Sequence, residues 1–289
     1  MKKRQYYKVA DHLFSVSQTL DSSYEPFHTG AGRPIFDVKI KMEQYHGKLK
    51  HPIIRQVEDD VEIKAGKVGF KFYFEFRLFK RRAAVLLTDI HYKTATLIVE
   101  EFPKYSIDSG LMVMYALSTA TRSTLLFHSS VVMEEGYAYM FLGKSGTGKS
   151  THSRLWLEAI EGAMLLNDDN PVVRAYPGGQ IYVYGSPWSG KTHCYKNDYG
   201  TLGGIVMLGQ AKYNRITVVD ETQAYQDIIT SVSGTAWNGR IRNGQHQTAM
   251  KLLRYVPIYH LKCRPDHEAA KVCHDGVRVY RKGIITNSN

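Results

Sequence analysis

Gly143-Lys144-Ser145-Gly146-Thr147-Gly148-Lys149-Ser150-Thr151 is the stretch that decides the fold of this chain. An apolar run at residues 137–142 precedes it, and the pattern of residues 150–161 predicts a helix after it. The stretch satisfies the pattern G-x-x-x-x-G-K-[S/T] in full. The sequence therefore predicts a strand, a glycine-rich loop and a helix in succession, within an α/β domain.

This loop has the chemistry of a phosphate cradle. Glycines let successive backbone N–H groups curl around a β-phosphate, and the following helix N-terminus adds its positive end. Lys149 is expected to reach the β- and γ-phosphates, and the Ser150 hydroxyl is expected to ligate Mg²⁺. A glycine-rich turn with a solvated lysine is the alternative, but the flanking strand and helix favour binding of ATP or GTP by all nine residues. These residues are Gly143, Lys144, Ser145, Gly146, Thr147, Gly148, Lys149, Ser150 and Thr151.

A second candidate group, Asp168 and Asp169, follows the short apolar run at residues 164–166. Carboxylates at a strand end can hold Mg²⁺ or accept a proton from an attacking hydroxyl. The same residues also make a good surface turn, so their place after the phosphate loop is what favours a functional role. His128, at the start of the preceding apolar run, would by itself be interpreted as structural.

Together these features resemble one family. The run from His128 through Ser-Ser-Val-Val, then residues 143–150, then Asp168-Asp169 looks like the catalytic domain of HPr kinase/phosphorylase. The same superfamily includes ATP-dependent phosphoenolpyruvate carboxykinase. The resemblance covers residues 125–190, is looser to about residue 279, and does not include the N-terminal part.

The resemblance implies a mixed-sheet α/β P-loop domain and assigns roles within it. One aspartate would be the general base on a hydroxyl acceptor, with Asp168 favoured, while Asp169 would help Ser150 hold the metal. His128 matches the histidine beside the transferred phosphate, which would also permit a reverse, dephosphorylating activity. Lys149 keeps its phosphate-binding role. Homo-oligomers are known in this family, although no feature of this sequence requires one.

The chain also departs from the family pattern. Thr151 stands where the kinases carry Glu, as it does in the carboxykinase loop. Residues 185–191, Gly-Ser-Pro-Trp-Ser-Gly-Lys, replace a Pro- and Arg-rich substrate loop and are interpreted as a substrate or phosphate loop containing Lys191. Arg240 and Arg242 could cover the γ-phosphate, or could equally be solvated arginines.

The leading hypothesis is therefore an ATP-dependent kinase that phosphorylates a hydroxyl, with a serine of a protein or peptide as acceptor. One alternative is a carboxykinase-like or metabolite kinase acting on a small acid, although the chain is short and lacks the expected upstream Lys and His ligands. Another is a nucleotide-binding regulator without catalysis, against which the intact Lys149, Ser150, Asp168 and Asp169 argue. DNA binding comes last, because the basic residues are not concentrated in one arm and no recognition motif is present.

Composition sets outer limits on these hypotheses. The chain has 289 residues, is 43% hydrophobic and 22% charged, and carries a formal net charge of +11. No apolar stretch is long enough for a membrane helix, and the basic start is not followed by the apolar segment of an export signal. The three scattered cysteines form no C-x-x-C pair, so free thiols and a cytoplasmic location are expected.

Two domains are predicted: a smaller β-rich domain at residues 1–105 and the P-loop kinase-like domain at residues 106–289. In the first, strands are expected at residues 35–42, 84–90 and 94–101. Residues 68–78 are expected to form one eleven-residue strand whose aromatic stripe faces the core. The pattern further predicts strands at 125–133, 164–166, 204–209 and 257–263, and helices at 107–122, 222–231, 245–255 and after Asp266.

Overall fold

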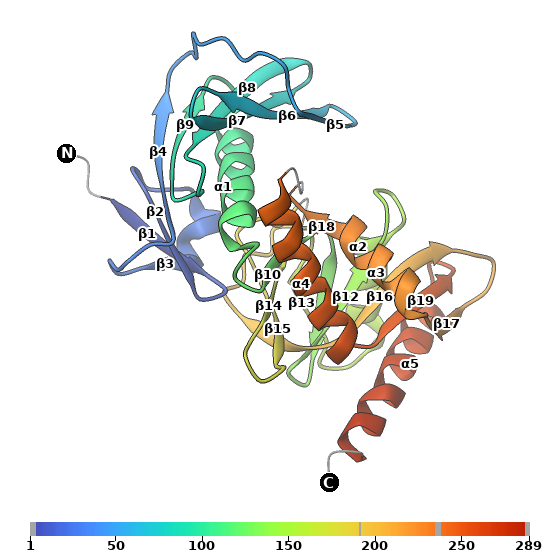
Figure 1. The fold of residues 1–289 in the computed structure, drawn as a ribbon. Helices are drawn as coiled ribbons and strands as arrows, with labels where there is room; N and C mark the ends of the chain where they lie inside the picture. Colours follow the sequence, from blue (N-terminus) through green and yellow to red (C-terminus); the bar gives the residue numbers. More distant parts are fainter. Residues whose placement is uncertain (1–3, 191, 235–237, 287–289) are drawn as a thin grey trace. The chain divides into compact units, whose positions relative to one another are not determined.

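The computed structural model describes residues 4–190, 192–234 and 238–286. The chain divides into two compact units (Figure 1). Unit 1 comprises Met1–Arg122 and Gly234–Arg242, and unit 2 comprises Ser123–Ser233 and Asn243–Asn289. Each is built on a large mixed β-sheet. Helix α1 (Pro103–Thr119) packs on β4, β7, β8 and β9 of unit 1, so the structure divides after Arg122, not at the residue-105 boundary drawn from the sequence.

Unit 1 contains nine strands among its described residues, in the order β3-β1-β2-β4-β9-β8-β7-β6-β5. Strand β4 runs parallel to both β2 and β9, and the other neighbours are antiparallel. The strands are β1 (Gln5–Val9), β2 (His12–Val16), β3 (His28–Thr29), β4 (Phe36–Met42), β5 (Ile54–Glu58), β6 (Val61–Val68), β7 (Lys71–Leu78), β8 (Arg81–Thr88) and β9 (Thr94–Val99), with a short 3-10 helix, η1 (Ser22–Phe27).

The prediction of one strand over residues 68–78 was wrong. Strand β6 ends at Val68 and β7 begins at Lys71, with Gly69 and Phe70 forming the turn of a hairpin between them. Gly69 has φ +58°, a value that glycine adopts without steric cost. Phe70 is therefore at the tip and 97% exposed, whereas the rest of the stripe in β7, Phe72, Phe74 and Phe76, is buried as predicted.

Unit 2 contains ten strands among its described residues. The main order is β13-β11-β12-β16-β15-β14-β10-β18, and β19 pairs with both β16 and β17. Strands β12, β16 and β19 are parallel to one another, so their carboxyl ends meet at one edge. The strands are β10 (Thr124–Phe127), β11 (Ser130–Glu134), β12 (Tyr137–Leu142), β13 (Met164–Asn167), β14 (Val172–Ala175), β15 (Ile181–Tyr184), β16 (Tyr199–Gln210), β17 (Arg215–Val218), β18 (Val232–Ser233) and β19 (Ile258–Cys263).

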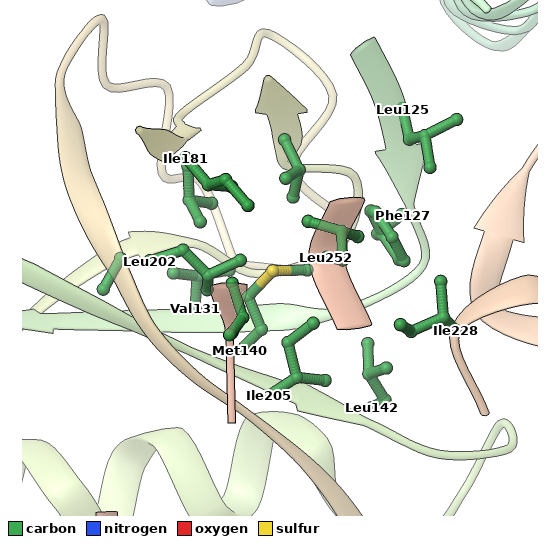
Figure 2. Packing of buried hydrophobic residues seen from close by; sticks show 14 of the residues in the cluster. Leu125, Phe127, Val131, Met140, Leu142, Ile181, Leu202, Ile205, Ile228 and Leu252 are labelled. Carbon is green, nitrogen blue, oxygen red and sulfur yellow. The ribbon is translucent and has the colours of Figure 1, made fainter. Parts of the chain in front are cut away.

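Helices cover both faces of this sheet. The helices are α2 (Lys149–Ala159), α3 (Glu221–Ser231), α4 (Gly239–Tyr255), whose first four residues belong to unit 1, and α5 (His267–Thr286). Met140 and Leu142 of β12 point into a core formed with Ile228 of α3 and Leu252 of α4 (Figure 2). The alternate residues of β12, Tyr139 and Phe141, pack instead with side chains of α2 and α5. Each such buried side chain contributes about 1.5–3 kcal/mol, so the strand that leads into the glycine-rich loop is held from both sides.

The strand predicted over residues 125–133 is in fact two strands. Strand β10 ends at Phe127 and pairs with β14 and β18, whereas β11 begins at Ser130 and pairs with β12 and β13. His128 and Ser129 connect β10 to β11, which pair with different neighbours in the sheet. An uninterrupted apolar pattern hides this break, because both halves are fully buried strands.

The other predicted elements of unit 2 are present with shifted ends. Strand β16 and helix α4 extend beyond the predicted ranges, while α3 and β19 nearly coincide with them. Helix α5 begins directly after Asp266, whose carboxylate accepts a hydrogen bond from the Ala269 N–H at 2.9 Å, the expected N-cap. All three cysteines are free, as predicted. Among the described residues, no helix is long and apolar enough to cross a membrane.

Candidate functional site

The glycine-rich loop connects β12 to α2 with a backbone that glycine alone adopts easily. Gly143, Gly146 and Gly148 have φ values of +151°, +78° and +103°. A Cβ atom added at Gly146 or Gly148 would have no atom within 4 Å. Glycine is therefore needed there for its conformation and not to avoid a clash, and the space above the loop is open.

The start of helix α2 leaves backbone donors for a ligand. Gly148 is the N-cap and provides no side chain to cap the helix, and the first helical bond runs from the His152 N–H to the Gly148 carbonyl at 2.8 Å. The N–H groups of the first turn have no intrahelical acceptor. Together with the positive end of the helix dipole, they suit an anion such as a phosphate.

Lys149 lies across this loop. Its Nζ donates to the carbonyl oxygens of Gly143 at 3.0 Å and Lys144 at 3.4 Å. Ser150, the next residue, is exposed, so its hydroxyl is accessible at the N-terminus of the helix. The Ser150 hydroxyl is thus accessible, whereas the Lys149 ammonium group is bonded to loop carbonyls, so its contact with a nucleotide stays a prediction.

Asp168 and Asp169 follow the last residue of β13, Asn167, which is fully buried and fixes their turn. The Asn167 Oδ1 accepts the Asp169 N–H at 2.9 Å, and its Nδ2 donates to the Ser186 Oγ at 3.1 Å. The Ser186 hydroxyl in turn donates to the Asn170 carbonyl at 2.6 Å. Buried polar groups in such a network hold one geometry, because each would be costly to leave unpaired.

The Asp168 carboxylate accepts two hydroxyl hydrogen bonds. Ser130 Oγ donates to its Oδ1 at 2.7 Å, and Thr192 Oγ1 donates to its Oδ2. Ser130 Oγ also lies 2.6 Å from Ser153 Oγ on helix α2. Since Ser153 is three residues after Ser150, the two share one face of the helix. The carboxylate is thus connected through Ser130 to the helix that begins at the glycine-rich loop.

Asp169 faces the other predicted residue, His128. The His128 Nδ1 lies 3.0 Å from the Asp169 Oδ1, with the two side chains 45% and 31% exposed. The backbone reinforces this pairing, because the Ser129 N–H donates to the Asp169 carbonyl at 2.9 Å. The crossing between β10 and β11 therefore brings His128 to the paired aspartates.

The segment predicted as a substrate loop packs against this turn. A Cβ added at Gly190 would lie 3.2 Å from the Asp169 Cβ, so only a glycine permits this approach without displacement. Ser189 Oγ donates to the Thr192 carbonyl at 2.7 Å. Lys191, which was part of the prediction, lies outside the described residues.

Two other predicted residues, Arg240 and Arg242, are exposed at the start of α4 and belong to unit 1, so their expected place over a γ-phosphate stays a prediction. A cavity of about 990 Å³ in unit 2 lies elsewhere, between the β14–β15 turn and the ends of α4 and β17. None of the described loop residues or aspartates lines it.

Sequence patterns did not single out Ser130, Ser153 or Thr192. Ser130 belongs to the run quoted for the family resemblance, but only its pairing in β11 directs its hydroxyl to Asp168. Ser153 could have been found from its three-residue spacing from Ser150. Thr192 carried no signal, because it lies twenty-four residues from Asp168 in the sequence, with strands β14 and β15 between them.

His152 is a buried residue of α2 that helps to anchor the loop. Its Nε2 accepts a hydrogen bond from the Trp156 Nε1 at 3.2 Å, and its ring meets Phe141 edge-on. Desolvation by burial lowers the pKa of His152 to about 4. The ring is therefore neutral near pH 7 and packs between Phe141 and Trp156.

No protein-family model matches this chain, and no curated protein matches it. Among solved structures, the chain is similar to the HPr(Ser) kinase/phosphatase from Coxiella burnetii, with 10% identity and a TM-score of 0.31. The alignment covers 55% of this chain and 97% of that one. Values this low indicate a distant relation at most, and they transfer neither a reaction nor a substrate to this chain.

Proposed function

We propose that the chain binds ATP or GTP with Mg²⁺ on residues 143–151 and transfers the γ-phosphoryl group to a hydroxyl, most simply a serine of a protein or peptide. The observation that carries this proposal is the placement of Asp168. Its carboxylate accepts hydroxyl hydrogen bonds and is joined through Ser130 to helix α2, which begins at the glycine-rich loop. A hydroxyl hydrogen-bonded to a carboxylate beside a phosphate cradle is the geometry that phosphoryl transfer requires.

The loop would supply binding and charge stabilisation. Backbone N–H groups at the start of α2 would hold the β-phosphate, and Lys149 would leave the loop carbonyls to contact the β- and γ-phosphates. Transfer of a phosphoryl group depends mainly on positioning and on stabilising the charge of the equatorial oxygens. A pre-formed loop with glycines in left-handed conformations provides that positioning before the nucleotide arrives.

Asp168 would take the proton of the acceptor hydroxyl. Ser130 holds one carboxylate oxygen, which fixes the orientation of the group. The other oxygen accepts from Thr192, which is exposed, so an incoming hydroxyl can replace it. The base thus has one anchored oxygen and one oxygen open to exchange.

The oxygen donors at this site fit Mg²⁺. Ser150 offers an exposed hydroxyl and Asp169 a partly exposed carboxylate, and Mg²⁺ prefers hard oxygen ligands completed by water and substrate phosphates. When bound, the ion would neutralise charge on the transferred phosphoryl group. His128, paired with Asp169, would orient that carboxylate.

The test uses the purified full chain with Mg²⁺ and γ-labelled ATP in a lysate rich in proteins and metabolites from the source of the chain. Lys149→Ala and Asp168→Asn remove the phosphate ligand and the base. Arg154→Ala is the matched control, because it removes an exposed charge from the same helix α2 outside the site. Nucleotide binding by each variant is measured separately by calorimetry.

Label on a protein or peptide that is lost in Lys149→Ala and Asp168→Asn but kept in Arg154→Ala would support the proposal. Label on a small molecule alone would favour a metabolite kinase or a carboxykinase-like reaction. Nucleotide binding without any transfer would favour a regulator. Absence of nucleotide binding to the wild-type chain would overturn the proposal entirely.

A further inference from the structure

Thr192 places a hydroxyl on the carboxylate proposed as the general base. Its Oγ1 donates to Asp168 Oδ2, which is the oxygen that Ser130 does not occupy. A phosphate acceptor would make the same contact immediately before transfer. The chain therefore presents one of its own hydroxyls where an acceptor hydroxyl would lie.

Contacts of neighbouring residues hold Thr192 in the position from which it reaches Asp168. The Ser189 hydroxyl donates to the Thr192 carbonyl at 2.7 Å. Two residues after Thr192, the Cys194 side chain is buried, with its Sγ 3.5 Å from the Leu166 carbonyl oxygen. These two contacts hold the backbone at Thr192 and just after it, while the Thr192 side chain itself stays exposed.

Of the two hydroxyls on Asp168, only that of Thr192 can move toward a ligand. Ser130 is fully buried in strand β11, and its oxygen is also engaged with Ser153. Thr192 lies in an irregular segment and is reachable from solvent. The route to the phosphate loop is short, because Ser153 lies three residues after Ser150, a separation of about 5–6 Å between Cβ atoms on a helix.

We propose that Thr192 is a self-phosphorylation site, a proposal that rests on the phosphoryl transfer proposed above. The Thr192 oxygen attacks the γ-phosphorus of bound ATP, and the bond from that phosphorus to the β,γ-bridging oxygen breaks. The Thr192 proton passes to Asp168, ADP leaves, and a phosphothreonine remains. Atoms and charge balance without a further reactant.

The product would change the site. A phosphate adds about −1.5 to −2 charge, which is repelled by Asp168 and Asp169. It also removes the donor that occupied the open oxygen of Asp168. Phosphorylation is therefore expected to displace the Thr192 side chain from Asp168, which leaves that carboxylate oxygen accessible to the hydroxyl of an external acceptor.

The experiment incubates the full chain with Mg²⁺ and ATP alone and locates phosphate by peptide mass spectrometry. Phosphothreonine is expected at residue 192 of the wild-type chain and of Arg154→Ala. Thr192→Ser should be modified at the same position, whereas Lys149→Ala and Asp168→Asn should stay unmodified. Thr192→Val keeps the shape of the side chain without a hydroxyl, and its labelling should fall at least tenfold.

A rate per chain that does not change with protein concentration would show transfer within one chain, as the contact with Asp168 requires. If ATP is bound and its phosphate reaches water or another acceptor while Thr192 remains unmodified, the inference is overturned and the proposed kinase activity stands. If the wild-type chain binds no nucleotide, both fail. Circular dichroism of each variant confirms that the fold is retained.

Discussion

The Ser130 hydroxyl lies 2.6 Å from the Ser153 hydroxyl and joins strand β11 to helix α2. Because Ser130 donates its own proton to Asp168, Ser153 must be the donor to Ser130. The hydrogen bonds are thus donated in one direction, from helix α2, which follows the glycine-rich loop, to the carboxylate. These two hydrogen bonds connect the helix of the predicted nucleotide site to the predicted base.

Removing the Ser130 hydroxyl, the middle group of this hydrogen-bonded series, should slow phosphoryl transfer without weakening nucleotide binding. In Ser130→Ala, Asp168 loses its anchor and the buried Ser153 hydroxyl loses its acceptor. We expect a transfer rate about tenfold lower and a loss of stability of about 1–3 kcal/mol. Single-turnover rates, calorimetric nucleotide affinity and urea unfolding measure the three quantities. Ser153→Ala is the control, since it leaves the Ser130–Asp168 bond, and an equal loss of rate in both variants would contradict the orienting role of Ser130.

The left-handed backbone of the loop gives a second prediction. Gly148→Ala introduces a side chain at φ +103°, with open space around it, so the cost is conformational strain of about 1–2 kcal/mol. Relief of that strain would turn the first N–H groups of α2 away from a phosphate, so nucleotide affinity should fall at least tenfold.

Gly162→Ala is the matched control for that change. Gly162 lies just beyond the other end of α2 with φ +79° and similar open space. Its substitution should cost comparable stability in urea unfolding while leaving nucleotide affinity, measured by calorimetry, as in the wild-type chain. Equal losses of affinity in the two variants would assign the effect of Gly148→Ala to general destabilisation of the helix.

Local patterns predicted the succession of strand, glycine-rich loop and helix, because every feature of it lies within one continuous stretch. The apolar run of β12, the glycines and the helix start are all neighbours in the sequence. The hairpin turn at Gly69–Phe70 escaped prediction, since Phe70 continues the period-two pattern although the backbone reverses there. Strand pairing is a non-local property, and alternation along one strand contains no information about where the partner strand begins.

The site shows the same division between local and non-local information. His128, Asp168 and Asp169 were chosen from the sequence, and the structure brings His128 and Asp169 to 3.0 Å. The hydroxyl partners of Asp168 come from β11 and from the irregular segment after β15, which meet only in the folded sheet. Residue type alone could not select them, because the hydroxyls that reach the half-buried Asp168 carboxylate are decided by how distant segments pack.

Burial of His152 predicts a loss of stability in mild acid. Its pKa is lowered to about 4 in the folded chain from 6.5 in the unfolded chain. Between these values the unfolded state binds more protons, so its contribution to stability is present above pH 6.5 and is lost as the pH falls toward 4. The full change is about 3 kcal/mol. Urea unfolding of the wild-type chain and of His152→Gln at several pH values isolates this term, and parallel pH profiles for the two proteins would contradict it.

Separate roles for the two aspartates predict two different kinetic defects. Asp168→Asn keeps a side chain of the same shape that can still accept from Ser130, but it removes the proton acceptor. Transfer should therefore fall about 10²–10⁴-fold, while the Mg²⁺ concentration for half-maximal nucleotide binding stays unchanged. Asp169→Asn should instead raise that Mg²⁺ concentration several-fold and lower the rate less, because a neutral amide is a weaker Mg²⁺ ligand than a carboxylate.

Titration of Mg²⁺ at fixed ATP, with binding and single-turnover transfer followed in parallel, separates the two effects. His128→Ala is the control for the contact of His128 Nδ1 with Asp169 Oδ1 at 3.0 Å, since it frees the Asp169 carboxylate and leaves its charge in place. If Asp169→Asn abolished transfer at saturating Mg²⁺ while Asp168→Asn retained it, the assignment of the base would have to move to Asp169.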